Sequence, residues 1–249
     1  MGIYDRDYYR STSRSSIGGM AVASITTWLI LINIGVFIVD QVLKRPGGYA
    51  WRMGPDGQPE MYRQTIRPLL VWGSFTIVDA IKHLQLWRFI TFQFLHENVM
   101  HIFGNMLCLY FFGPMIESYL GRNRYLLFYL LCGIAGPFSF MALCGLHVLG
   151  ADLNTQMIGA SAGIFGVLIA GACIAPNATV MLLFPPIPMR LKTMAWLMIA
   201  LAAYTAFTNG RNAGGEAAHL GGAALGYLLI THPHWLPSFR RKPRWRGWG

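Results

Sequence analysis

A serine flanked by small residues is the first position in this chain that could carry out chemistry. Ser161 is the centre of the string Gly159-Ala160-Ser161-Ala162-Gly163, which has the form G-x-S-x-G. In soluble hydrolases this form produces a sharp turn that exposes the serine hydroxyl. Small residues are also common in membrane helices because they allow close packing, so the string alone is weak evidence for catalysis.

A serine hydroxyl needs a base to become an effective nucleophile, and His219 is the best candidate for that base. It stands in an otherwise small and apolar stretch, AAHLGGAA at 217–224. In a soluble core, a histidine bonded to a backbone carbonyl would be the better interpretation, but the cost of burial in lipid favours a functional role. Gly222 and Gly226 have the G-x-x-x-G spacing that lets a helix pack closely, which would bring His219 toward Ser161.

Two further polar residues fall on one face of a predicted helix. His101 and Asn105 are four positions apart, and each offers a side-chain donor for the developing oxyanion of an acyl-transfer reaction. Taken alone, a hydrogen bond between helices would be the simpler role. His96 lies five positions before His101, but no third ligand shares their face, and the four cysteines show no metal-ligand spacing. We therefore expect neither a metal nor a cofactor.

These polar residues interrupt long apolar runs. The chain is 54% hydrophobic and 12% charged, whereas a soluble domain carries about 25% charged residues. A span needs about 20 apolar residues. The sequence thus predicts an all-α, polytopic membrane protein with six transmembrane helices, at about 21–43, 98–118, 125–146, 160–175, 191–207 and 216–231. The expected organisation is a tail at 1–20, a membrane domain at 21–232 with a long interfacial loop at about 44–97, and a basic tail at 233–249.

The net charge of +10 raises the possibility of nucleic-acid binding, but the basic residues lie mainly in tails and connections, as membrane orientation requires. Short connections favour cytoplasmic N- and C-termini, although Lys44 and Arg45 oppose that orientation. The second, fourth and sixth helices would then all enter from the outer side and bring their polar residues to one face. The fourth run has about 16 residues and spans about 24 Å, less than a hydrocarbon core of about 30 Å, so Ser161 would lie below the surface.

The ordered set of motifs resembles the rhomboid family of intramembrane serine proteases. It comprises Trp87-Arg88, HENVMHIFGN at 96–105, ESYLGRNR at 117–124, GASAGIFG at 159–166 and AHLGGAALG at 218–226. The resemblance implies that Ser161 is the nucleophile and His219 the general base, a dyad without an acid. It also implies an oxyanion hole formed by His101, Asn105 and the backbone N–H of Ser161.

The resemblance assigns supporting roles to other positions. Trp87 and Arg88 would belong to the interfacial first loop, Glu117 and Gly121 to the cytoplasmic end of the second helix, and Gly222 and Gly226 to the packing of the sixth. His96, Gly159 and Gly163 belong to the same motifs. The loop between the fifth and sixth helices would act as a cap, and the fifth helix as a lateral gate.

One position departs from the family pattern. Many members have a tyrosine four residues after the serine, stacked on the histidine, and this chain has Phe165. Stacking can be kept there, but a hydrogen bond from a tyrosine hydroxyl cannot.

The expected reaction is hydrolysis of peptide bonds in or near transmembrane segments of other proteins. The expected location is a bacterial cytoplasmic membrane, and the sequence leaves the oligomeric state open. One alternative is an inactive rhomboid-like protein that binds membrane proteins, but such relatives typically lack the serine or the histidine. A transporter or channel is less favoured because we find no repeat and the polar cluster lies at one end of the helices rather than at the midplane.

Overall fold

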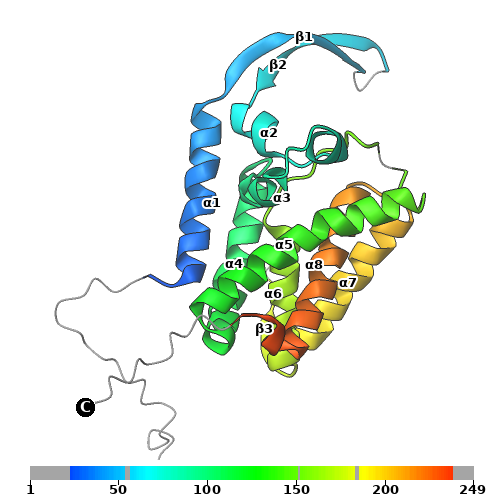
Figure 1. The fold of residues 1–249 in the computed structure, drawn as a ribbon. Coiled ribbons are helices and arrows are strands. Elements are labelled where there is room, and N and C mark those ends of the chain that lie inside the picture. The colour runs from blue at the N-terminus through cyan, green and yellow to red at the C-terminus, as the bar shows by residue number, and fades with distance from the viewer. Residues whose placement is uncertain (1–22, 54–56, 151, 183–184, 238–249) are drawn as a thin grey trace, which may run out of the picture.

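Six long helices form the body of the protein within the described residues, which are 23–53, 57–150, 152–182 and 185–237 of the computed structural model (Figure 1). They are α1 (Ile25–Val42), α4 (Val99–Leu120), α5 (Arg122–Gly145), α6 (Ser161–Ile174), α7 (Leu191–Phe207) and α8 (Ala213–Thr231). Each overlaps one of the six predicted helices, and the predicted starts of α5 and α8 were three residues late. The predicted tail at 1–20 and most of the predicted basic tail at 233–249 lie outside the described residues.

Three of these helices, α1, α4 and α5, are long and apolar enough to cross a membrane. The helices α6 and α7 are apolar but shorter, and α6 has only 14 residues. Much of the surface of the three long helices is not buried inside the protein, as expected for helices whose solvent is lipid.

Local side-chain contacts fix where the helices begin. Asn98 caps α4, and its side-chain oxygen accepts a hydrogen bond of 2.9 Å from the backbone N–H of His101. The start of α1 is held by Glu117 near the end of α4, whose carboxylate accepts bonds of 2.8–2.9 Å from Ile25 N, Thr26 N and Thr26 Oγ1. Because the first N–H groups of a helix have no intrahelical acceptor, this carboxylate satisfies α1 and joins it to α4.

Helix α6 is the most enclosed of the six and packs between α4, α5 and α8 (Figure 1). All residues from Ala162 to Gly171 are buried. Glycines make this packing possible: a Cβ on Gly222 of α8 would lie 2.0 Å from the Ala162 carbonyl oxygen, and one on Gly226 would lie 2.5 Å from Gly166 Cα. The backbones of α6 and α8 therefore touch along the length that carries Ser161 and His219.

The prediction of an all-α fold is incomplete, because two short antiparallel hairpins accompany the helices. The first hairpin, β1 (Arg45–Met53) and β2 (Pro59–Ile66), follows α1. The second, β3 (Thr179–Met181) and β4 (Pro188–Arg190), joins α6 to α7. The first was not predicted because Pro46, Gly47 and Gly48 are typical of loops. The pairing shifts register between Pro46 and Tyr49, and this irregularity accommodates them.

The rest of the first loop is a set of short turns of helix. They are α2 (Pro68–Gly73), the π-helical turn η3 (Val78–Lys82), α3 (Arg88–Thr91) and the 3-10 turn η4 (Phe92–Phe94). Arg88 is buried and ties them together, donating to the carbonyls of Ser74 and Val71 and to the side chain of Gln85. Trp72 stacks on Trp87 with ring centroids 5.5 Å apart. This loop is therefore a folded part of the protein.

A buried ion pair attaches the loop to the start of α4. Arg67 pairs with the buried carboxylate of Asp40 in α1 and donates to the carbonyls of His96, at 2.6 Å, and Glu97, at 3.0 Å. The two carbonyls belong to the turn that precedes His101. Arg67 thus links α1 to the segment from which the polar face of α4 begins.

Candidate active site

Ser161 is the first residue of α6 and follows an extended segment that the first loop holds in place. Backbone bonds of 2.8 and 3.0 Å pair Met157 with Phe75, and Gly159 N donates to the carbonyl of Phe92 at 2.9 Å. Gly159 has φ +124°, which L side chains rarely adopt, and a Cβ there would lie 2.8 Å from His101 Nε2. Glycine is therefore required for the turn that aims Ser161 into the pocket.

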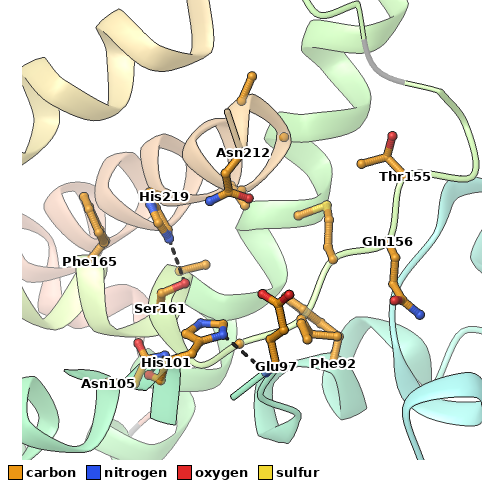
Figure 2. A pocket seen from close by; sticks show the side chains of 18 of the residues that line it. Phe92, Glu97, His101, Asn105, Thr155, Gln156, Ser161, Phe165, Asn212 and His219 are labelled. Carbon is orange, nitrogen blue, oxygen red and sulfur yellow. Dashed lines mark hydrogen bonds between the residues drawn. The ribbon is translucent and has the colours of Figure 1, made fainter. Parts of the chain in front are cut away.

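His219 faces Ser161 across the contact between α6 and α8 (Figure 2). Its Nε2 lies 2.7 Å from Ser161 Oγ, within hydrogen-bond range. The other ring nitrogen, Nδ1, lies 2.8 Å from Oε2 of Glu216, one turn earlier in α8. A hydroxyl, an imidazole and a carboxylate thus lie in series, the arrangement that activates a serine as a nucleophile.

Phe165 covers one face of the His219 ring. The ring centroids are 4.3 Å apart and the rings are inclined by 8°, which is a stacked arrangement. Phe165 lies one turn after Ser161 in α6, so the same helix supplies the hydroxyl and the surface on which the imidazole rests. The phenylalanine keeps the stacking contact that the family tyrosine would make.

His101 and Asn105 lie on the other side of Ser161 from His219 (Figure 2). The backbone N–H of Glu97 donates to His101 Nδ1 over 3.4 Å, which leaves the proton of a neutral ring on Nε2, the nitrogen beside Gly159. Asn105 Nδ2 donates to the carbonyl of His101 at 3.0 Å and keeps a second N–H for another acceptor. Two donors therefore flank Ser161, and the start of α6 adds N–H groups without intrahelical acceptors.

His96 is fully buried behind His101, with ring centroids 5.1 Å apart in an edge-to-face arrangement. Burial, followed by the charge of His101, lowers the pKa of His96 to about 3, so this ring is neutral at physiological pH. Among the described residues, no group of three or more His, Cys, Asp or Glu side chains is placed to hold a metal ion. The contact that the structure gives His96 is its edge-to-face packing against the ring of His101.

A pocket of about 1080 Å³ opens over these side chains. Ser161, His219, His101 and Asn105 are in its lining, together with residues of the turn between α7 and α8, of the segment at 155–159, and of the neighbouring faces of α4 and α7. This volume is slightly above the usual range of about 300–1,000 Å³ for small-molecule sites, so it is large enough for several residues of an extended peptide.

The predicted site residues separate into three groups. Those that line the pocket are Ser161, His219, His101, Asn105, Gly159 and Phe165. The glycines Gly163, Gly222 and Gly226 lie at helix contacts, and a Cβ on Gly163 would lie 2.9 Å from the Tyr129 ring. Trp87 and Arg88 hold the first loop together away from the pocket lining, and His96 lies behind His101.

Glu216 is the residue that sequence reasoning missed. The family resemblance implied a dyad without an acid, whereas the structure puts this carboxylate in contact with His219. The signal was present in the sequence, because residues three apart in a helix share a face. It was overlooked because Glu216 stood at the predicted start of the helix, where an acidic residue is expected because its charge interacts favourably with the helix dipole.

Comparison with known proteins agrees with the family resemblance of the motifs. The family model for the rhomboid domain matches residues 83–234. The chain is 25% identical to Rhomboid protease AarA of Providencia stuartii over 243 residues, covering 90% of this chain and 78% of that protein. It is 32% identical over 158 residues to a mitochondrial presenilin-associated rhomboid-like protein A of Danio rerio, and 33% identical over 141 residues to the mitochondrial Rhomboid protein 1 of Saccharomyces cerevisiae.

The matches cover 63% and 54% of this chain, and only 40% and 38% of those two longer mitochondrial proteins. The matched range includes the pocket residues Ser161, His219, His101 and Asn105. With its apolar helices, the chain is an integral membrane protein. It belongs to the rhomboid family.

Proposed function

We propose that this chain is an intramembrane serine endopeptidase that hydrolyses peptide bonds in or near the transmembrane segments of other membrane proteins. One observation carries the proposal: Ser161 Oγ and His219 Nε2 are 2.7 Å apart at the wall of a large pocket. A hydroxyl and an imidazole at this distance can exchange a proton. The name of the relative AarA, a rhomboid protease, supports the same activity.

The proposed reaction begins when His219 Nε2 takes the Ser161 proton as Oγ attacks the carbonyl carbon of the scissile bond. The oxygen that becomes negative accepts hydrogen bonds from His101 Nε2–H, the free Asn105 amide N–H and the Ser161 backbone N–H. The imidazolium of His219 then gives its proton to the departing amine as the C–N bond breaks, and an acyl ester on Ser161 Oγ remains. Water adds to the ester with His219 again as base, which releases the new carboxyl end and restores Ser161.

We further propose that all six long helices span the membrane, with both termini in the cytoplasm. Helices α4, α6 and α8 then begin on the outer side, which is consistent with His101 and Ser161 lying in the first turns of α4 and α6 and His219 in the second turn of α8. The 14 residues of α6 span about 21 Å, less than the hydrocarbon core of about 30 Å. Ser161 is therefore submerged and receives water through the pocket. A bacterial cytoplasmic membrane is the proposed location.

Substrates enter as helices and must be cut as extended chains. A helical backbone has its carbonyls bonded internally, so the scissile carbonyl becomes available only after local unwinding. We propose that segments containing Gly or Pro are preferred, since both weaken a helix. The expectation for a model substrate is that a run of Leu inserted at the cleavage site suppresses cleavage, and cleavage at the original rate would contradict it.

The test of the function is cleavage of a transmembrane substrate by purified protein in liposomes, with products identified by mass spectrometry. Wild type should cut within or next to the transmembrane segment, and Ser161→Ala should not. Binding of the substrate without any cut, by a protein whose folding is verified, would favour the alternative of an inactive rhomboid-like binding protein. Both Ser161 and His219 are present here, which favours the protease.

A further inference from the structure

Glu216 is an acidic residue next to the proposed base, and its contact with His219 is short and largely shielded. Its Oε2 lies 2.8 Å from His219 Nδ1, and the two side chains are 22% and 14% exposed. We propose that Glu216 is a positioning residue that holds His219 with its proton on Nδ1 and stabilises the imidazolium formed during the reaction. The inference rests on the proposed function, because it assigns Glu216 a part in the same site.

The two contacts of the imidazole define its tautomer. An ionised carboxylate only accepts hydrogen bonds, so the bond to Glu216 requires a proton on Nδ1. In the neutral ring Nε2 is then left with a lone pair, and this nitrogen faces Ser161 Oγ at 2.7 Å. Ser161 therefore donates to His219, which is the direction that proton transfer from the serine requires.

Phe165 gives Glu216 a specific task in this chain. Stacking at 4.3 Å fixes the plane of the imidazole but still allows a rotation of the ring by about 180° about the Cβ–Cγ bond, which keeps the plane and exchanges nitrogen with carbon positions. A hydrogen bond to a ring nitrogen stops that rotation, and a phenylalanine side chain has no group that can provide one. Glu216 and Ser161 thus hold opposite sides of a ring that Phe165 holds by its face.

Among the described residues, Glu216 is the carboxylate that contacts His219 directly. From α4 the ring is faced by the neutral ring of His101, and Glu97 precedes that helix and contacts His101 through its backbone N–H. Helix α6 contributes the Ser161 hydroxyl, and Tyr129 of α5 lies against Gly163. Arg211, in the turn before α8, is exposed. An imidazolium beside His101 gains most from the carboxylate one turn away in its own helix.

A simpler role exists for an acidic residue in the first turn of a helix. Glu216 is in the first turn of α8, where a negative charge interacts favourably with the helix dipole. That role predicts a small loss of stability when the charge is removed, with no change in the tautomer of His219. The two roles are therefore separated by measurements on the ring and on turnover.

The test compares Glu216→Gln, Glu216→Ala and Glu216→Asp with wild type, and uses Glu60→Gln in the exposed hairpin as the matched control. The first readout is the ¹⁵N chemical shifts of His219 in histidine-labelled protein in detergent micelles, assigned with His219→Gln. Wild type should show the Nδ1–H form, whereas Glu216→Ala should show a mixture or the Nε2–H form. Glu216→Asp should retain part of the Nδ1–H signal of His219, and Glu60→Gln should retain the whole of that signal.

The second readout is turnover of a transmembrane substrate. Glu216→Ala should lower kcat by about 10- to 100-fold with KM changed by less than about 2-fold, a smaller loss than removal of a general base because water can partly replace this half-buried carboxylate. Glu216→Gln should also lower kcat, by less than Glu216→Ala, because an amide oxygen can still accept from Nδ1–H but carries no charge to stabilise the imidazolium. Glu216→Asp should recover part of the kcat lost in Glu216→Ala.

Failure of the inference and failure of the proposed function give different results. A wild-type protein that never cleaves substrate overturns the function, while the ¹⁵N shifts still test whether Glu216 fixes the tautomer. Unchanged ¹⁵N shifts in Glu216→Ala, together with unchanged kcat in Glu216→Ala and Glu216→Gln, would overturn the inference and leave the protease intact. Thermal unfolding of each variant identifies any that fails to fold. If Glu216→Ala does not fold, the kcat of the isosteric Glu216→Gln decides whether the carboxylate contributes to turnover.

Discussion

Replacing Gly222 by alanine tests whether the contact between α6 and α8 sets the distance from the serine to the histidine. A Cβ at this position would lie 2.0 Å from the Ala162 carbonyl oxygen, which belongs to the backbone and cannot move aside alone. Carbon–oxygen contacts between helices are about 3.3–3.6 Å, so α8 must retreat by about 1.3 Å or more. Because Gly222 is three residues after His219, both are on the face of α8 that turns toward α6.

The expected consequence follows from the distance in the wild type. His219 Nε2 is 2.7 Å from Ser161 Oγ, and a retreat of about 1.3 Å would place the two atoms about 4 Å apart, beyond hydrogen-bond range. A misplacement of about 1 Å reduces catalysis by about 100-fold. We expect Gly222→Ala to lower the rate of substrate cleavage by about that factor, and overpacking to cost about 1–3 kcal/mol of stability.

The assay is the initial rate of cleavage in liposomes, measured together with the unfolding of each variant. Gly35→Ala, in α1, is the matched control, because a Cβ there would have no atom within 4 Å, and its rate should equal that of wild type. A folded Gly222→Ala protein that cleaves within about 2-fold of wild type would refute the reasoning that this backbone contact positions the imidazole.

Three further predictions concern side chains around the site and the core. Phe165→Ala removes the ring stacked on His219, an interaction worth about 1 kcal/mol, and should lower kcat by about 10-fold. Phe165→Tyr keeps the stacked ring and should keep the wild-type kcat. Equal kcat values for the two variants would contradict the stacking role. Glu117→Ala leaves the N–H groups of Ile25 and Thr26 unpaired and should lower the free energy of unfolding by about 2–4 kcal/mol, measured by denaturant titration in mixed micelles; a loss below about 0.5 kcal/mol would contradict it. The depressed pKa of His96, about 3 against the usual 6.5, means that the unfolded chain binds a proton that the folded chain does not. Stability should therefore fall as pH drops from about 7 toward 3, and His96→Phe should flatten this dependence in thermal unfolding, with an unchanged slope counting against it.

The long helices could be predicted because lipid imposes a simple requirement on sequence. A span must be about 20 apolar residues. Each of the six predicted runs overlaps a helix, and three of these helices, α1, α4 and α5, are long and apolar enough to span. The predicted starts of α5 and α8 were late because Arg122 and the Gly-rich stretch at 214–215 look like connections. In the structure Gly121, with φ +80°, ends α4 directly before Arg122, so the connection is a single residue.

The first hairpin could not be predicted from the apolar pattern. The strand from Arg45 to Met53 begins with a proline and two glycines, and its alternation of Tyr49, Trp51 and Met53 extends over only five residues. What specifies it is the pairing with 59–66, including Trp51 opposite Met61. Such pairing depends on a partner strand that local sequence does not reveal.

The polar residues of the site were identifiable because each interrupts an apolar helix. His101, Asn105 and His219 are conspicuous for that reason, and Ser161 for its glycines. Glu216 lacked this contrast because it lies next to a polar turn. The ion pair of Arg67 with Asp40 was also missed, since the two residues are 27 positions apart and only the folded loop brings them together.

The most direct test of the central claim is labelling by a fluorophosphonate probe, followed by peptide mass spectrometry of the purified protein. We expect one adduct, on Ser161, that forms in wild type, forms much more slowly in His219→Ala and does not form in Ser161→Ala. An adduct on another residue, or labelling of wild type at the rate seen for His219→Ala, would contradict the claim that this histidine activates this serine.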